Sequence, residues 1–98
     1  MKMIYCAHEY GGKRKNKRAA EKKIMRLCKK YPQHCFISPI HTFGHLYKVL
    51  SYEDGMVLCL KLLSKCDELW ILSDDSRGVK IEREYAKKYS IPIYEAIK

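Results

Sequence analysis

The fold of this chain is decided by the stretch ELWILSDDSRGVKIEREYAKKYSIPIY at residues 68–94. It begins with an apolar run of strand length, ELWIL, and closes with a second one, IPIY. Between them, from Ser76 onward, apolar side chains recur every three or four positions, which is typical of a helix with one buried face. The order strand, helix, strand predicts two parallel strands joined by a helical crossover.

The same alternation extends over the rest of the chain. Two further strands are expected, MIYCA at residues 3–7 and CFIS at residues 35–38. One further helix is expected from about Lys15 to Tyr31, where Pro32 ends it. Another is expected to run to about Lys65, opened by a capping pattern of Ser51 and Asp54. The segment PIHTFGHLYKVL at residues 39–50 is expected to be a loop.

Short apolar strands that alternate with helices predict a mainly parallel sheet covered on both faces. We therefore expect one α/β domain over residues 1–98, a three-layer Rossmann-like (flavodoxin-like) sandwich with a four-stranded sheet. In sheets of this kind, ligands bind beyond the carboxyl ends of the strands.

Composition excludes several classes of protein. With 47% hydrophobic and 32% charged residues, the chain is expected to fold rather than to be disordered. Its apolar runs are too short to cross a bilayer and its first residues do not resemble a signal peptide, so we expect no membrane partner. Five cysteines without a CxxC pair indicate reduced thiols and a cytoplasmic location. Cys28 and Cys66 have apolar neighbours and are expected in the core, as is Trp70.

Positive charge is concentrated in one segment. Of the twenty Lys and Arg residues, ten lie between Lys13 and Lys30, where Glu21 is the only acidic residue. This segment is either a solvated helix face or a surface for nucleic acid or a phosphorylated small molecule. It contains no interleaved aromatic residues, so base stacking along it is not indicated.

One carboxylate interrupts the apolar face of the helix at residues 76–86. Glu82 falls in the middle of the arc formed by Val79, Ile81, Tyr85 and Ala86. A carboxylate near the start of a helix is stabilised by the helix dipole but poorly hydrated among apolar neighbours, which suits a nucleophile or a base. The alternative is a structural role, in a salt bridge with a neighbouring lysine.

Other polar residues follow the predicted strands and should meet at one edge of the sheet. They are His8 and Tyr10 after the first strand, His41 after the second, and Ser76 and Gly78 after the third. A serine hydroxyl and backbone N–H groups at a helix start can bind a phosphate. Tyr5, on the first strand, is placed to reach the Glu82 carboxylate and fix its rotamer.

The segments MIYCAHEYGG, Asn16, SPIH and CDELWILSDDSRGVKIEREYAKKYSIPIY resemble the nucleoside 2-deoxyribosyltransferase-like superfamily, in particular its small members of unassigned function. The most specific piece is Ser76-x-Gly78-Val79-x-x-Glu82, followed by Tyr85-Ala86. Related deoxynucleoside 5′-monophosphate N-glycosidases carry the same motif.

This resemblance implies roles for individual residues. Glu82 would be the nucleophile that attacks the anomeric carbon of a deoxyribosyl group, and Tyr5 would orient its carboxylate. Ser76 would contact a phosphate or a sugar, while His8, Tyr10 and Asn16 would border the substrate. The implied reaction parallels that of a retaining glycosidase. The resemblance also implies a homo-oligomer.

The sequence departs from the catalytic families at one informative position. Those families usually have an aspartate eight residues before the aspartate of the CD motif, and counting back from Asp67 reaches Cys59. Three hypotheses follow: an N-glycosidase or deoxyribosyltransferase, a non-catalytic binder of a nucleotide-like ligand, and a nucleic-acid-associated protein.

No metal and no cofactor are expected. His41 and His45 are four residues apart, but zinc sites usually combine two close pairs of ligands, and Gly44 disfavours a helix that would present both imidazoles. Both histidines are interpreted as loop residues near a ligand pocket. A Cys6–His8 nucleophile is only weakly indicated, because no third residue is placed to orient the pair.

Overall fold

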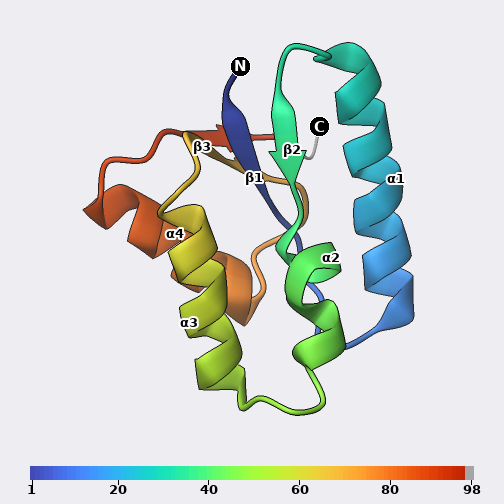
Figure 1. Cartoon of the computed structure of the whole chain (residues 1–98), viewed down its shortest axis with the longest axis vertical. Helices are drawn as coiled ribbons and strands as arrows, with labels where there is room; N and C mark the ends of the chain where they lie inside the picture. Colours follow the sequence, from blue (N-terminus) through green and yellow to red (C-terminus); the bar gives the residue numbers. More distant parts are fainter. Residues whose placement is uncertain (97–98) are drawn as a thin grey trace.

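A computed structural model of the chain describes residues 1–96, in which strands and helices alternate (Figure 1). The strands are β1 (Met3–Ala7), β2 (Cys35–Ile37), β3 (Glu68–Ile71) and β4 (Ile93–Glu95). The helices are α1 (Arg14–Lys30), α2 (Pro39–Phe43), α3 (Tyr52–Leu63) and α4 (Arg77–Lys88), with a short 3₁₀ turn η1 (Gly44–Leu46). The predicted α/β fold is confirmed.

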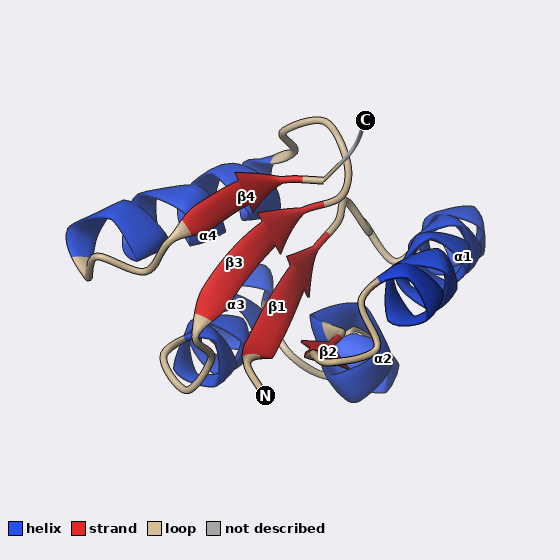
Figure 2. Ribbon diagram, turned by 90° about the horizontal axis from the view of Figure 1, so that it is seen from above, coloured by secondary structure: helices blue, strands red, loops and turns tan. Residues whose placement is uncertain are grey.

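The four strands form one parallel sheet in the order β2-β1-β3-β4. Figure 2 shows α1 on one side of this sheet and α3 and α4 on the other, which gives three layers. The order is that of flavodoxin-like sheets, in which the connections reverse direction between β1 and the strand beside it. All four carboxyl ends therefore lie along one edge, with the reversal between β1 and β3.

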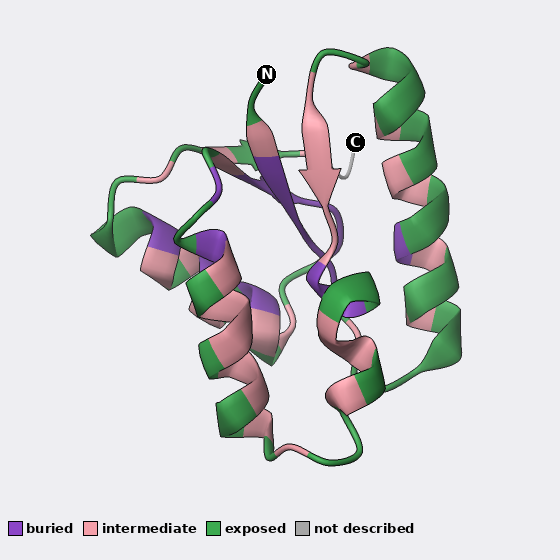
Figure 3. Ribbon diagram, in the orientation of Figure 1, coloured by how far each residue is buried: buried purple, intermediate pink, exposed green. Residues whose placement is uncertain are grey.

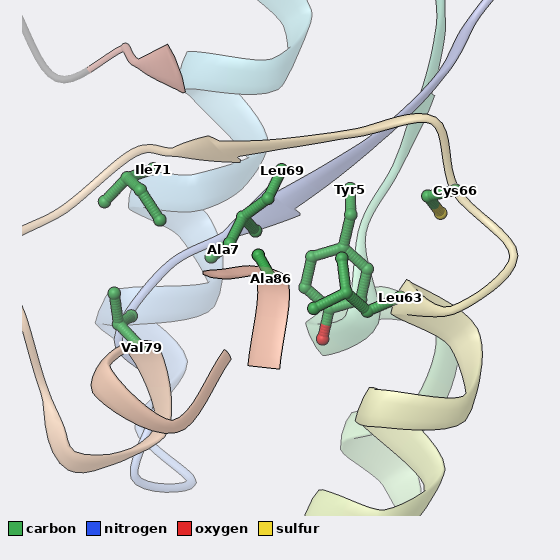
Figure 4. Close-up of a cluster of buried hydrophobic side chains, with 8 residues drawn as sticks. All are labelled: Tyr5, Ala7, Leu63, Cys66, Leu69, Ile71, Val79 and Ala86. Carbon is green, nitrogen blue, oxygen red and sulfur yellow. The ribbon is translucent and has the colours of Figure 1, made fainter. Parts of the chain in front are cut away.

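The side chains of β1 point alternately to the two faces of the sheet. Ile4 and Cys6 belong to a cluster packed against α1, together with Trp70 and Leu72. Tyr5 and Ala7 belong to the cluster under α3 and α4 (Figure 4); its other members are Leu63, Cys66, Leu69, Ile71, Val79 and Ala86. Figure 3 shows that the buried residues concentrate in the sheet and on the helix faces against it.

The predicted core holds for Trp70 and Cys66, which are both buried, but is wrong for Cys28, which is exposed. The buried stripe of α1 passes through Ala20, Ile24 and Leu27. Cys28 lies one residue beyond Leu27, about 100° further around the helix, and this turns its side chain toward solvent.

The segment predicted as a loop at residues 39–50 begins with two short helical elements instead. Helix α2 starts at Pro39, a residue preorganised for the first helical position. Ser38 caps it by accepting a hydrogen bond from the His41 N–H at 3.3 Å. The turn η1 follows at Gly44.

Among residues 1–96, every helix is too short or too polar to span a membrane. Within the same residues, no three His, Cys, Asp or Glu side chains are grouped so that they could hold a metal ion.

Candidate functional site

A cavity of about 500 Å³ opens at the carboxyl edge of the sheet. Its walls come from four parts of the chain: the loop after β1 with the first turn of α1, the α2–η1 segment, α3 as far as Cys59, and the start of α4. The volume is in the range of sites for small molecules, roughly 300–1,000 Å³. The cavity lies where the topology of the sheet predicts a ligand.

Glu82 lies in the second turn of α4 and faces this cavity. Only 5% of the residue is exposed, and one carboxylate oxygen accepts a hydrogen bond from the hydroxyl of Tyr5, which is fully buried on β1. Within the described residues, no Lys, Arg or His forms an ion pair with Glu82. The salt bridge considered from the sequence is therefore absent.

Burial controls the protonation of this pair. Burial raises the pKa of Glu82 from its ordinary value of 4.5 to about 7, and the hydrogen bond from Tyr5 partly opposes the rise. Burial and the neighbouring carboxylate raise the pKa of Tyr5 well above 10, so the phenol stays protonated and donates. Near neutral pH the carboxyl group therefore exchanges between its acid form and a nucleophilic anion.

Cys59 of α3 lines the same cavity, close to Tyr5 and Glu82. Burial, followed by the charge of Glu82, raises the pKa of its thiol to about 11. The thiol is therefore neutral at physiological pH. Among the described residues, two carboxylates line the cavity, those of Glu82 and of Glu9 in the loop after β1.

Replacing Tyr5 by phenylalanine should raise the pKa of Glu82 further. The ring keeps its packing, but the hydrogen bond that stabilises the ionised carboxylate is lost. A hydrogen bond to a charged group of this kind corresponds to roughly one pH unit. Carbon-detected NMR titration of the Glu82 carboxyl measures the change. Tyr89→Phe, at an exposed position on the end of α4, is the matched control and should leave the titration unchanged. A pKa that stays the same or falls in Tyr5→Phe contradicts the assignment.

His8 follows β1, is buried and lines the cavity. Its Nε2 lies 3.0 Å from the Lys23 ammonium, which can only donate, so the ring proton resides on Nδ1 and is donated to the Glu9 carbonyl at 2.7 Å. Burial lowers the pKa of His8, and Lys23 adds to that effect. Both ring nitrogens are therefore occupied by the protein, which leaves His8 to contact a ligand through its carbon edge.

The rest of the first loop is held against η1. Gly12 has φ +73°, and a Cβ there would lie 2.7 Å from the ring of Tyr47, so glycine is required on both counts. Tyr10 packs edge-on against Tyr47 with ring centres 5.4 Å apart. Asn16 of α1 donates its side-chain N–H to the Tyr10 carbonyl at 2.9 Å. Tyr10 and Asn16 both line the cavity.

Ser76 and Gly78 line the cavity at the start of α4. Ser76 is the N-cap residue, and its hydroxyl accepts a hydrogen bond from the Val79 N–H at 3.3 Å. At Gly78, a Cβ would lie 3.2 Å from the Tyr52 hydroxyl, so the glycine lets α3 and α4 approach closely. This wall presents the N-terminus of a twelve-residue helix to the cavity.

Sequence reasoning missed Tyr52 and Arg77, which also line the cavity. The Tyr52 hydroxyl is buried and has no hydrogen-bond partner within the described residues. The Arg77 guanidinium lies over the Tyr52 ring, 4.2 Å from its centre. Arg77 stands inside the Ser76–Gly78 motif and Tyr52 directly follows the cap Ser51, so their positions in the sequence could have indicated both residues.

His41 does not join the other predicted site residues, and its expected position is corrected. It lies on the exposed side of α2, where its Nδ1 is 2.7 Å from the Ser38 hydroxyl, and it lines a separate shallow hollow beside α1. Because this segment is helical, Pro39, Ile40 and Phe43 face the cavity and His41 does not.

Fold and site together define an α/β protein with a ligand-sized cavity and one buried carboxylate at the carboxyl edge of a parallel sheet. The chain belongs to the family described as domain of unknown function (DUF4406), which it matches over residues 2–95. No curated protein and no solved structure matches the chain.

Proposed function

We propose that the protein acts on a (deoxy)nucleoside or its 5′-monophosphate, as an N-glycosidase or deoxyribosyltransferase with Glu82 as the nucleophile. The observation that carries this proposal is a buried carboxylate, free of any cationic partner in the described residues, that opens on a cavity. The resemblance to the nucleoside 2-deoxyribosyltransferase-like superfamily supports the same residue for the same role.

The chemistry needs one carboxylate and two steps. The ionised Glu82 attacks C1′ of the sugar, the bond from C1′ to the base nitrogen breaks, and the base leaves with a proton taken from solvent. Water or a second base then attacks C1′, the glycosyl ester breaks, and the Glu82 carboxylate is restored. Tyr5 fixes one carboxylate oxygen by its hydrogen bond, which leaves the other oxygen for attack.

A phosphate on the substrate would bind at the start of α4. Backbone N–H groups and the positive end of the helix dipole favour an anion there. The guanidinium of Arg77 lies at the same wall of the cavity and adds a positive charge. These groups support a 5′-monophosphate as the ligand.

A second candidate function is non-catalytic binding of the same class of ligand. Cys59 favours it, because a neutral thiol stands at the position where the resemblance implies a second carboxylate. In this case the cavity would hold the nucleotide without breaking its glycosidic bond.

One experiment tests both functions. The protein is incubated with each deoxynucleoside and each monophosphate, free base is measured by chromatography, and binding is measured by calorimetry on the same set. Release of free base establishes the first function. Binding without release establishes the second, and neither binding nor release for any compound would contradict both. The cytoplasmic location and the homo-oligomeric state remain predictions.

A further inference from the structure

Helix α1 carries a continuous row of positive charge. Every fourth residue from its first to its last position is basic, and all five side chains are exposed: Arg14, Arg18, Lys22, Arg26 and Lys30. Residues four apart are neighbours on a helix surface, and each is turned about 40° from the one before, so these five form a row that winds about 160° around α1. We call this row the basic stripe. Within residues 1–96, no salt bridge involves any side chain of α1.

The basic stripe is unfavourable for the free helix. Like charges four residues apart repel each other and destabilise a helix, and the stripe contains four such pairs in succession. Helix α1 is held instead by the packing of Ala20, Ile24 and Leu27 on the sheet. A face that serves only solubility usually carries both signs of charge, whereas this one is complementary to a polyanion.

The basic stripe begins at the cavity. Lys13 and Asn16 line the cavity wall, and Arg14, the first residue of the stripe, stands between them in the sequence. Figure 1 shows α1 leading away from the loop after β1 along one side of the molecule. At about 1.5 Å per residue, the helix extends the positive charge over roughly 25 Å.

From this continuity we propose that the substrate is the terminal nucleotide of a single-stranded nucleic acid, with its sugar and base in the cavity and the adjoining phosphates on the basic stripe. This inference rests on the proposed function of the cavity. A nucleotide must be unpaired for its base and sugar to enter a cavity, which favours a single strand over a duplex. Because α1 contains no aromatic residue, the stripe contacts phosphates and not bases, so binding is independent of sequence.

Fluorescence anisotropy with a short single-stranded DNA tests the proposal, with calorimetric titration of a deoxynucleoside monophosphate beside it. The oligonucleotide should bind at least about tenfold more tightly than the monophosphate. Five phosphate contacts should give a logarithmic salt slope near −3.5, which is a loss of about a hundredfold from about 50 to about 200 mM salt.

The variant Arg18→Glu, Lys22→Glu, Arg26→Glu should lose at least about tenfold in oligonucleotide affinity and show a flatter salt slope. Its affinity for the monophosphate should stay unchanged, which also reports that it is folded. The matched control has the same number of reversals at exposed lysines outside α1, namely Lys61→Glu, Lys65→Glu and Lys88→Glu. The control should bind the oligonucleotide nearly as the wild type does.

The outcomes separate this inference from the proposed function. If the monophosphate binds and the oligonucleotide binds no more tightly, the substrate class is wrong while the function of the cavity stands. Equal losses in the α1 variant and in its control would also overturn the inference. So would a blunt duplex, polyglutamate or an anionic vesicle that binds as tightly as the single strand. If neither nucleotide nor oligonucleotide binds, the proposed function fails together with it.

Discussion

Replacing Glu82 by glutamine should abolish the release of free base from every nucleotide that the wild-type protein cleaves. The amide keeps the volume of the side chain and an oxygen that accepts the hydrogen bond from Tyr5, but it has no anionic oxygen to attack the sugar. Loss of a nucleophile of this kind should reduce kcat by at least about 10³-fold. Chromatography of the free base measures the loss.

The same variant should still bind its ligand. Calorimetry should give an affinity for the monophosphate close to that of the wild type, because the start of α4 and the loop after β1 are unchanged. Wild-type protein quenched rapidly in acid should carry one added glycosyl group by mass spectrometry, and Glu82→Gln should carry none. Glu84→Gln, at an exposed carboxylate on the same helix, is the control and should cleave normally.

The wild-type rate provides an independent readout. Because burial raises the pKa of Glu82 to about 7, the nucleophilic anion forms only as the pH rises through that value. Base release should therefore increase with pH and level off above about pH 8. Undiminished release by Glu82→Gln would show that another group attacks the sugar, and the proposed mechanism would then be wrong.

The face that Glu82 occupies could be predicted from the sequence because helical periodicity alone fixes it. Val79 and Ala86, three residues before and four residues after Glu82, are almost completely buried and lie within about 60° of it around the helix, so helical spacing places Glu82 on the buried face. The contact between Glu82 and Tyr5, which are 77 residues apart, could also be predicted, because a parallel sheet brings the first strand close to the start of the last helix.

Other parts of the site depend on contacts that no local pattern encodes. The approach of the Tyr52 hydroxyl to Gly78 exists only once α3 and α4 are packed together. The tautomer of His8, in the loop after β1, is set by Lys23 of α1, which is 15 residues away in the sequence. Helix α2 was missed because five residues are too few to show a periodicity, although Ser38 and Pro39 carry a helix-start signal.

The Glu82→Gln variant should be more stable than the wild-type protein at about pH 8. The folded-state pKa of Glu82 is about 7, whereas the ordinary value is 4.5. Between these values the native state binds more protons than the unfolded state, so the free energy of unfolding falls as the pH rises. The favourable contribution of protonated Glu82 to the free energy of unfolding is fully present below about pH 4.5 and is lost as the pH rises through about 7.

The difference between the folded-state and ordinary pKa of Glu82 corresponds to a loss of about 3 kcal/mol in the free energy of unfolding once the carboxyl group is fully ionised. For a domain of fewer than 100 residues it should raise Tm by about 12 °C in Glu82→Gln at about pH 8, and by little at about pH 4. Thermal unfolding at both pH values measures the effect. His8 has a lowered pKa and acts in the opposite direction, but it is present in both proteins, so the difference between them isolates Glu82.

Equal Tm values for the two proteins at about pH 8 would show that the carboxylate is well solvated, and the nucleophile assignment would lose its physical basis. A higher Tm for the variant would mean that the wild type keeps a destabilising charge in its interior. The structural role considered from the sequence, a salt bridge, needs a cation beside Glu82, and the described residues place none there. A buried charge that lowers the stability of the native state and faces a cavity is typical of a residue that is needed for activity and not for folding.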